Sequence, residues 1–93
     1  MNFTHVAGKN QNHRVTLYAL STCSWCRKTR ELLEANGIDY QFIYVDLLTG
    51  AERDEAINRV RELNPRASYP TIEIDGTVVA GFDEPRIRKL LGI

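Results

Sequence analysis

The stretch RVTLYALSTCSWCRKTRELLEANG, residues 14–37, joins a β pattern to a helical pattern and contains both cysteines of the chain. In its first half, apolar residues alternate with more polar ones, which predicts a strand over 14–20. Its second half has helical spacing and predicts a helix over 24–37. Cys23 and Cys26 therefore lie where a strand turns into a helix.

The ends and faces of this helix follow from its residue types. Ser21 and Thr22 supply the side chains that commonly cap a helix N-terminus, and Gly37 is a natural stop. The inner face is expected to hold four residues: Cys26, Thr29, Leu32 and Leu33. For Lys28 and Arg30 we expect a solvated position on the outer face.

The rest of the chain continues this alternation of strands and helices. Thr49 precedes an amphipathic helix that ends at Asn64-Pro65, and Asp75-Gly76 joins two strands in a tight hairpin. Asp83 or Glu84 caps a last helix. The further predicted strands are 40–47, 71–75 and 77–81. The order is β-α-β-α-β-β-α, an α/β class.

The N-terminal segment lacks such a pattern. Residues 1–13 are polar, contain three asparagines and Gly8, and are expected to form a flexible polar tail. The ordered domain is then 14–93, without an internal repeat or linker. No apolar run reaches membrane-spanning length, and the first residues lack the apolar stretch of a secretory signal.

Composition narrows the class of function. Twelve basic residues balance twelve acidic ones, so we expect neither nucleic acid nor a membrane surface as partner. We expect a cytoplasmic location, where thiols are kept reduced and disulfides tend to be transient and catalytic. A structural disulfide across so short a loop would also restrain the unfolded chain little.

The spacing of the cysteines suits thiol–disulfide exchange. Cys23 meets the unsatisfied N–H groups and the positive dipole end at the helix start, which favour a thiolate. Cys26 lies almost one turn further and can resolve a mixed disulfide on Cys23. Arg27, four residues after Cys23, can add positive charge.

Two other readings of the cysteine pair remain open on the residues alone. Two buried cysteines acting as small apolar residues would not need a helix start. A zinc site needs about four ligands, and the other candidates are His5 and His13, both in the N-terminal segment. A redox pair therefore fits the pattern best.

Three segments, VTLYALSTCSWC, ASYPTIEIDG and AGFDEPRIRKLL, resemble the glutaredoxin branch of the thioredoxin superfamily. The resemblance covers about residues 14–93. It implies a thioredoxin-like fold, with a four-stranded mixed sheet flanked by helices, and a dithiol–disulfide oxidoreductase. In such a protein the Cys23 thiolate attacks a substrate disulfide, and Cys26 resolves the mixed disulfide.

The resemblance also implies a substrate groove. Tyr69-Pro70 occupies the place of a cis-proline and the residue before it, whose backbone can pair with a substrate like an added strand. Gly81 lets a ligand approach closely, and Phe82 and Asp83 continue that wall. Arg66 lies where some relatives bind a glutathione carboxylate; simple solvation of the loop is the competing reading.

The reductant is the open point. Glutathione-using members usually carry a lysine where this chain has Leu20, and a small β-branched residue where it has Tyr69. The GFDEPRIRKL tail also resembles NrdH-type redoxins, which take electrons from thioredoxin reductase and supply ribonucleotide reductase. Ser24 is compatible with a third alternative, a glutathione-ligated [2Fe–2S] carrier, although Leu20 disfavours it.

These features predict a monomer without a bound cofactor. Its partners would be disulfide-containing proteins or small disulfides, with glutathione or thioredoxin reductase as electron donor. Trp25, between the two cysteines, is expected to be an exposed apolar lid beside the site.

Overall fold

The computed structural model describes all 93 residues and contains one five-stranded mixed sheet. The strand order is β1-β3-β2-β4-β5, with β2 and β3 parallel and the other neighbours antiparallel. The strands are β1 (Thr4–Val6), β2 (Val15–Ala19), β3 (Tyr40–Tyr44), β4 (Thr71–Ile74) and β5 (Thr77–Ala80). The helices are α1 (Ser24–Ala35), α2 (Gly50–Leu63) and α3 (Glu84–Leu91), with a short 3₁₀ helix, η1 (Val45–Leu47).

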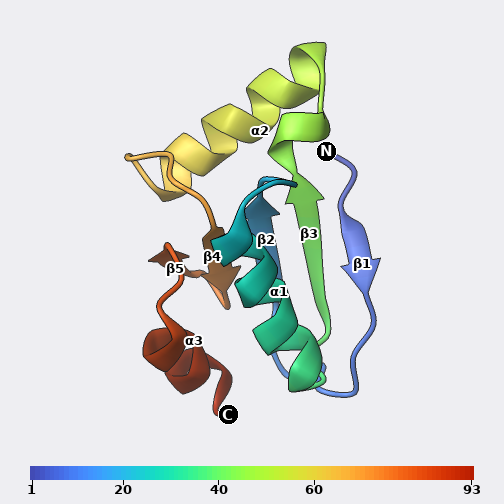
Figure 1. Ribbon diagram of the computed structural model, residues 1–93, viewed down its shortest axis with the longest axis vertical. Coiled ribbons are helices and arrows are strands. Elements are labelled where there is room, and N and C mark those ends of the chain that lie inside the picture. The colour runs from blue at the N-terminus through green and yellow to red at the C-terminus, as the bar shows by residue number, and fades with distance from the viewer.

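The three helices cover the two faces of this sheet (Figure 1). Alternate residues of β2 point to opposite faces, so that Leu17 joins one core cluster and Tyr18 the other. The larger cluster packs α1 and α3 against the sheet through Leu33 and Ile87. The smaller cluster packs α2 against the other face through Val60. This arrangement is the predicted thioredoxin-like α/β architecture.

The sheet has one strand more than predicted, and the extra strand comes from the N-terminal segment. We expected residues 1–13 to form a flexible polar tail, but Thr4–Val6 pairs antiparallel with β3. Gly8 N–H also donates to the Asp39 carboxylate (3.0 Å), and Asn10 bridges to Ile38. Backbone pairing with an edge strand needs no apolar alternation, so the sequence pattern gave no sign of it.

The ends of the elements agree with most of the predicted signals. The hairpin turn has positive φ at Asp75 and Gly76, as its tight geometry requires. Asp83 caps α3 by accepting a hydrogen bond from the Arg86 N–H (3.2 Å). The N-cap of α1 is Cys23 itself rather than Ser21 or Thr22, which corrects that prediction.

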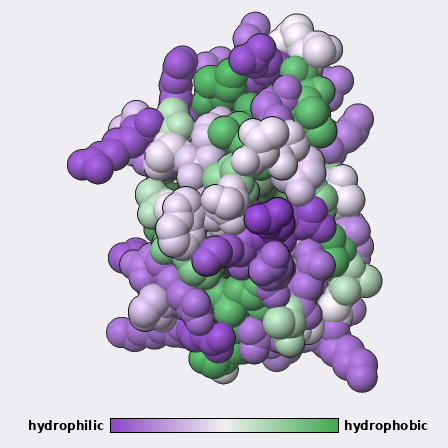
Figure 2. Space-filling view, viewed as in Figure 1, coloured by the Kyte–Doolittle hydropathy of each residue, from purple (hydrophilic) through white to green (hydrophobic).

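None of the helices is long and apolar enough to span a membrane. In the face shown in Figure 2, hydrophilic residues predominate and hydrophobic ones appear in patches between them.

Candidate redox site

The two cysteines lie on the first turn of α1 in different environments. Cys23 is half-buried at the N-cap, and its sulfur accepts a hydrogen bond from the Cys26 N–H (3.2 Å). Cys26 is buried, with 1% of its surface exposed. Burial, followed by its interaction with Cys23, raises the pKa of Cys26 to about 12. The accessible sulfur is therefore that of Cys23, and Cys26 holds its proton at neutral pH.

The turn before Cys23 is fixed by Asp46, which lies in η1 directly after β3. The Asp46 carboxylate accepts hydrogen bonds from both the N–H (2.8 Å) and the hydroxyl (2.5 Å) of Ser21. The Ser21 side chain is the main reason that the pKa of Asp46 is lowered. Cys23 N–H in turn donates to the Leu20 carbonyl (3.3 Å). Leu20, Ser21 and Asp46 thus hold the Cys23 sulfur in its position at the start of α1.

Tyr69 and Pro70 lie next to the cysteines, on the loop that leads into β4. The Tyr69–Pro70 peptide bond is cis, as predicted. Tyr69 packs against both core clusters, the one that contains Cys26 and the one beneath α2. Its backbone N–H and C=O make no hydrogen bond to another backbone group of the chain. They are therefore free to pair with a bound segment.

A buried asparagine holds this loop in place. The Asn64 side chain, 5% exposed, donates to the Ser68 hydroxyl (2.9 Å) and to the Thr71 hydroxyl (3.2 Å). Thr71 donates in turn to the Ser68 carbonyl (2.7 Å). The sequence indicated Asn64 only as the end of a helix, and its positioning role depends on contacts that the fold creates.

Trp25 and Phe82 form an aromatic platform on the other side of the cysteines. Their rings stack with centroids 5.7 Å apart and planes 25° apart, and Trp25 is 55% exposed, as expected of a lid. Lys28 Nζ lies 5.1 Å from the Trp25 ring centroid. Gly81 connects the aromatic platform to the loop that contains Pro70, because the Gly81 N–H donates to the Pro70 carbonyl (2.8 Å).

The structure thus brings six of the predicted site residues together and leaves two at the margin. The six are Cys23, Cys26, Tyr69, Pro70, Gly81 and Phe82. Asp83 is exposed and occupied as the cap of α3. Arg66 is exposed on the loop after α2, and its side chain forms no ion pair.

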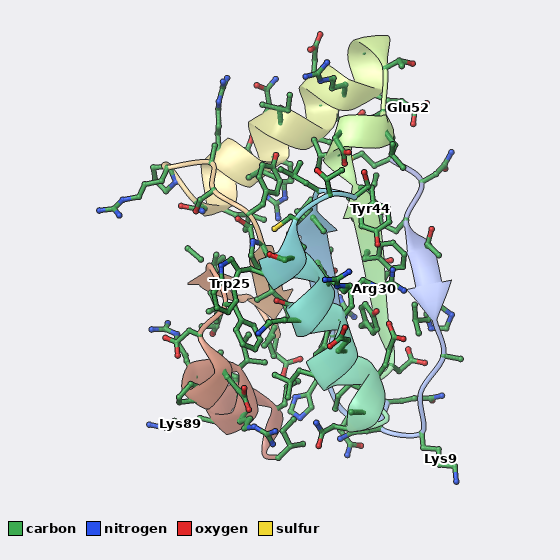
Figure 3. All side chains as sticks on the ribbon, viewed as in Figure 1. Lys9, Trp25, Arg30, Tyr44, Glu52 and Lys89 are labelled. Atoms are coloured by element: carbon green, nitrogen blue, oxygen red, sulfur yellow. The ribbon has the colours of Figure 1, made fainter.

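An open pocket of about 220 Å³ extends from Cys23 between α1 and the end of β3. Its lining includes Leu20, Arg27, Arg30 and Tyr44. Figure 3 shows Arg30 and Tyr44 on the same flank of the molecule, on α1 and β3. Because β2 and β3 are parallel, their C-terminal ends meet at one edge of the sheet. Residues that follow the C-terminal ends of neighbouring parallel strands tend to line a binding site. This tendency could have indicated Tyr44 and Asp46, which the sequence analysis missed.

Arg30 corrects the expectation of a solvated helix face. Its guanidinium lies 3.9 Å from the Phe42 ring centroid and donates to the hydroxyls of Tyr40 (2.9 Å) and Tyr44 (2.7 Å). It also pairs with Glu34 (3.2 Å). All three guanidinium nitrogens are therefore engaged within the chain.

The histidines that a zinc site would need lie elsewhere. His5 contacts the Asp39 carboxylate (2.8 Å), and His13 contacts Asp75 (2.6 Å) and the Leu91 carbonyl (3.1 Å). Nowhere in the chain do three or more metal-ligating side chains gather at one point.

Comparisons with known proteins agree with this geometry. The glutaredoxin family model matches residues 15–79. A glutaredoxin structure from Methanosarcina mazei is 44% identical, with a TM-score of 0.88, over 100% of this chain and 90% of the other. Methanoredoxin from Methanosarcina acetivorans is 42% identical, with a TM-score of 0.82, over 86% of this chain and 85% of the other.

A curated relative from Clostridium pasteurianum, a glutaredoxin-like 8.6 kDa protein in a rubredoxin operon, is 34% identical over 83% of this chain and 96% of its own length. The family match covers most of the sheet and both cysteines. The chain belongs to the glutaredoxin family of the thioredoxin superfamily.

Proposed function

We propose that the protein is a dithiol–disulfide oxidoreductase in which Cys23 is the nucleophile and Cys26 the resolving cysteine. The observation that carries this assignment is the contrast between the two sulfurs. Cys23 is reachable at the helix N-terminus and accepts a backbone hydrogen bond, whereas Cys26 is buried and protonated. Backbone donors at a helix start stabilise a sulfur anion there and not one turn deeper.

The exchange proceeds in two balanced steps. The Cys23 thiolate attacks one sulfur of the substrate disulfide, forming a mixed disulfide and releasing the other sulfur as a thiolate that takes up a proton. Cys26 then loses its proton and attacks Cys23, forming the Cys23–Cys26 disulfide and releasing the second substrate sulfur as a thiol. Two electrons pass from the protein dithiol to the substrate disulfide.

The walls of the groove orient the substrate in this proposal. An extended segment pairs with the free backbone groups of Tyr69, which lies beside the cysteines. The Trp25–Phe82 platform supports the substrate on one side, and the open space beside Gly81 leaves room for the substrate backbone. Because the platform is apolar and open, it suits side chains of protein substrates as well as small disulfides.

Serine substitutions test the assignment of the two roles. We expect Cys23→Ser to abolish reduction of bis(2-hydroxyethyl) disulfide, because the accessible sulfur is lost. Cys26→Ser keeps the attacking sulfur and should accumulate a mixed disulfide, visible by mass spectrometry of the intact protein. Full activity of Cys23→Ser, or a trapped adduct on Cys26 in that variant, would show that the roles are assigned wrongly.

The electron donor is decided by a second experiment. Leu20 lines the pocket at Cys23 and supplies no charge for a glutathione carboxylate. We therefore infer that thioredoxin reductase with NADPH regenerates the dithiol better than glutathione with its reductase. Both systems are to be compared with one disulfide substrate, and Leu20→Lys should shift the response toward glutathione. A wild-type protein that responds to glutathione alone contradicts this inference.

A further inference from the structure

One edge of α2 borders the proposed substrate groove and carries positive charges that the chain does not neutralise. Arg53, Ile57 and Arg61 are spaced four residues apart, so they follow one another along a single stripe of the helix. Arg53 and Arg61 are exposed and take part in none of the ion pairs of the structure.

This stripe lies beside Tyr69. Ile57 and Tyr69 both pack against the smaller core cluster, under α2. Burial raises the pKa of the Tyr69 hydroxyl. Among the charged side chains, Arg61 has the largest effect and lowers this pKa, and Arg53 lowers it as well. The arginines are therefore near the tyrosine whose backbone would pair with a substrate segment.

Most acidic groups around the groove are already occupied. Asp46 is bound by Ser21, Asp83 caps α3, and Glu84 pairs with Arg88 (2.8 Å). Arg59, on the opposite edge of α2, pairs with Glu62 (3.1 Å) and lies 3.9 Å from Glu73. Two exposed acidic residues, Glu52 and Asp54, flank Arg53 in the sequence and take part in none of the ion pairs. The stripe itself therefore carries two unpaired positive charges, Arg53 and Arg61, and no acidic residue lies between them at its four-residue spacing.

Building on the proposed function, we propose that the natural substrates are disulfides within acidic segments of proteins. The segment pairs with the Tyr69 backbone and rests an apolar side chain on the Trp25–Phe82 platform. Acidic side chains on its other side reach Arg53 and Arg61, with Ile57 between them. The groove thus recognises an apolar side chain on one side of the reacting substrate cysteine and acidic side chains on the other side.

The helix geometry sets a spacing for those acidic residues. Eight residues of α-helix separate Arg53 from Arg61, which is about 12 Å along the axis. An extended segment advances about 3.3 Å per residue, so acidic residues four positions apart span that distance and point to the same side. Complementary charge of this kind raises the rate of encounter and the selectivity among substrates.

Matched peptide disulfides test the proposal. Each peptide carries one cysteine in a disulfide with 2-mercaptoethanol, a leucine on one side, and on the other either two aspartates four residues apart or two asparagines. We expect kcat/KM to be about 3- to 10-fold higher for the aspartate peptide at low ionic strength, and this preference to shrink at high salt. Equal values for the two peptides would overturn the proposal.

Charge-matched variants locate the effect. Arg53→Gln with Arg61→Gln should remove most of the preference. Lys9→Gln with Lys89→Gln removes the same charge at positions that Figure 3 shows away from Trp25, and this variant should retain the preference. Equal loss in the two double variants would mean a general charge effect and would contradict the assigned surface.

Bis(2-hydroxyethyl) disulfide separates this proposal from the proposed function. Because that substrate is small and uncharged, its reduction should be the same in all these variants. If the wild-type protein fails to reduce it, the redox function itself is wrong. If it is reduced while the aspartate peptide has no advantage, or if a single-stranded nucleic acid competes for the arginines more strongly than the acidic peptide, only the proposed substrate class is wrong.

Discussion

The two ends of the sheet differ in how their polar groups are used. At the end that carries Cys23, the backbone of Tyr69 is unpaired, Trp25 is exposed, and two arginines of α2 lack partners. At the opposite end, His13 contacts both Asp75 and the Leu91 carbonyl, and Gly8 N–H binds Asp39. One end is closed by contacts within the chain, and the other leaves groups free for a substrate.

This difference teaches where stability and reactivity reside. Contacts at the closed end connect segments far apart in the sequence, since residues 13, 75 and 91 meet there. The open end depends on that support, because its cysteines and tyrosine rest on the shared core. Substitutions at the closed end should therefore change stability more than chemistry, and three experiments address the comparison.

The largest effect concerns the buried thiol of the open end at alkaline pH. The unfolded chain releases the Cys26 proton near its ordinary pKa of 9, whereas the folded protein keeps it until about pH 12. The folded state thus binds more protons in this window, and its stability falls as pH rises, by up to about 1.4 kcal/mol per pH unit. Urea unfolding of the reduced protein at a series of alkaline pH values measures this slope.

Two alanine variants isolate the contribution of Cys26. Cys26→Ala should flatten the alkaline fall in unfolding free energy, because the buried thiol is gone. Cys23→Ala is the matched control and should keep most of the steep fall, because burial, the larger cause of the raised pKa of Cys26, remains and tyrosine ionisation is common to both variants. Identical slopes in the two variants would show that burial of Cys26 does not govern the alkaline limb.

The next effect is steric and belongs to the closed end. A Cβ atom on Gly8 would lie 2.4 Å from the Gly37 carbonyl oxygen and 2.5 Å from the Asp39 nitrogen. Both are backbone atoms and cannot yield easily, so Gly8→Ala should lower the free energy of unfolding by about 1–3 kcal/mol. Ala7→Ser, at an exposed neighbour, is the control.

Activity measurements sharpen the meaning of this variant. Because Gly8 is far from the cysteines along the sheet, the folded fraction of Gly8→Ala should reduce bis(2-hydroxyethyl) disulfide at the wild-type rate. An unchanged free energy of unfolding would mean that Gly8 does not pack against the loop of residues 37–39 after α1. A slower rate with unchanged stability would connect the two ends in a way that the contacts do not explain.

The smallest effect appears in acid, again at the closed end. The Arg14 N–H, followed by His13, lowers the pKa of Asp75. A lowered pKa adds stability that is present above the ordinary value of about 3.9 and is lost as pH falls through the folded value. Asp75→Asn should therefore flatten the acid side of the stability curve. Asp54→Asn, at an exposed carboxylate without an ion pair, is the charge-matched control, and similar curves for both variants would argue against a role for the Asp75 contact.

Much of the fold was predictable because its signals are local. Alternation in RVTLYAL, the helical stripe that buries Cys26 and Leu33, and the Asp75-Gly76 turn all depend on neighbouring residues. The strand β1 was not predictable in this way. Its three residues are held by the edge of β3, so the pairing depends on a partner more than thirty positions away.

The amino-acid sequence by itself determined the strand–helix corner, the cysteine pair and the family, because spacing along the chain is enough to define them. Only the tertiary structure decided how Asn64 holds the Tyr69 loop and why Arg30 is engaged while Arg61 is free. Burial, charge pairing and hydrogen bonding depend on segments that meet in space, and a linear pattern does not specify those meetings.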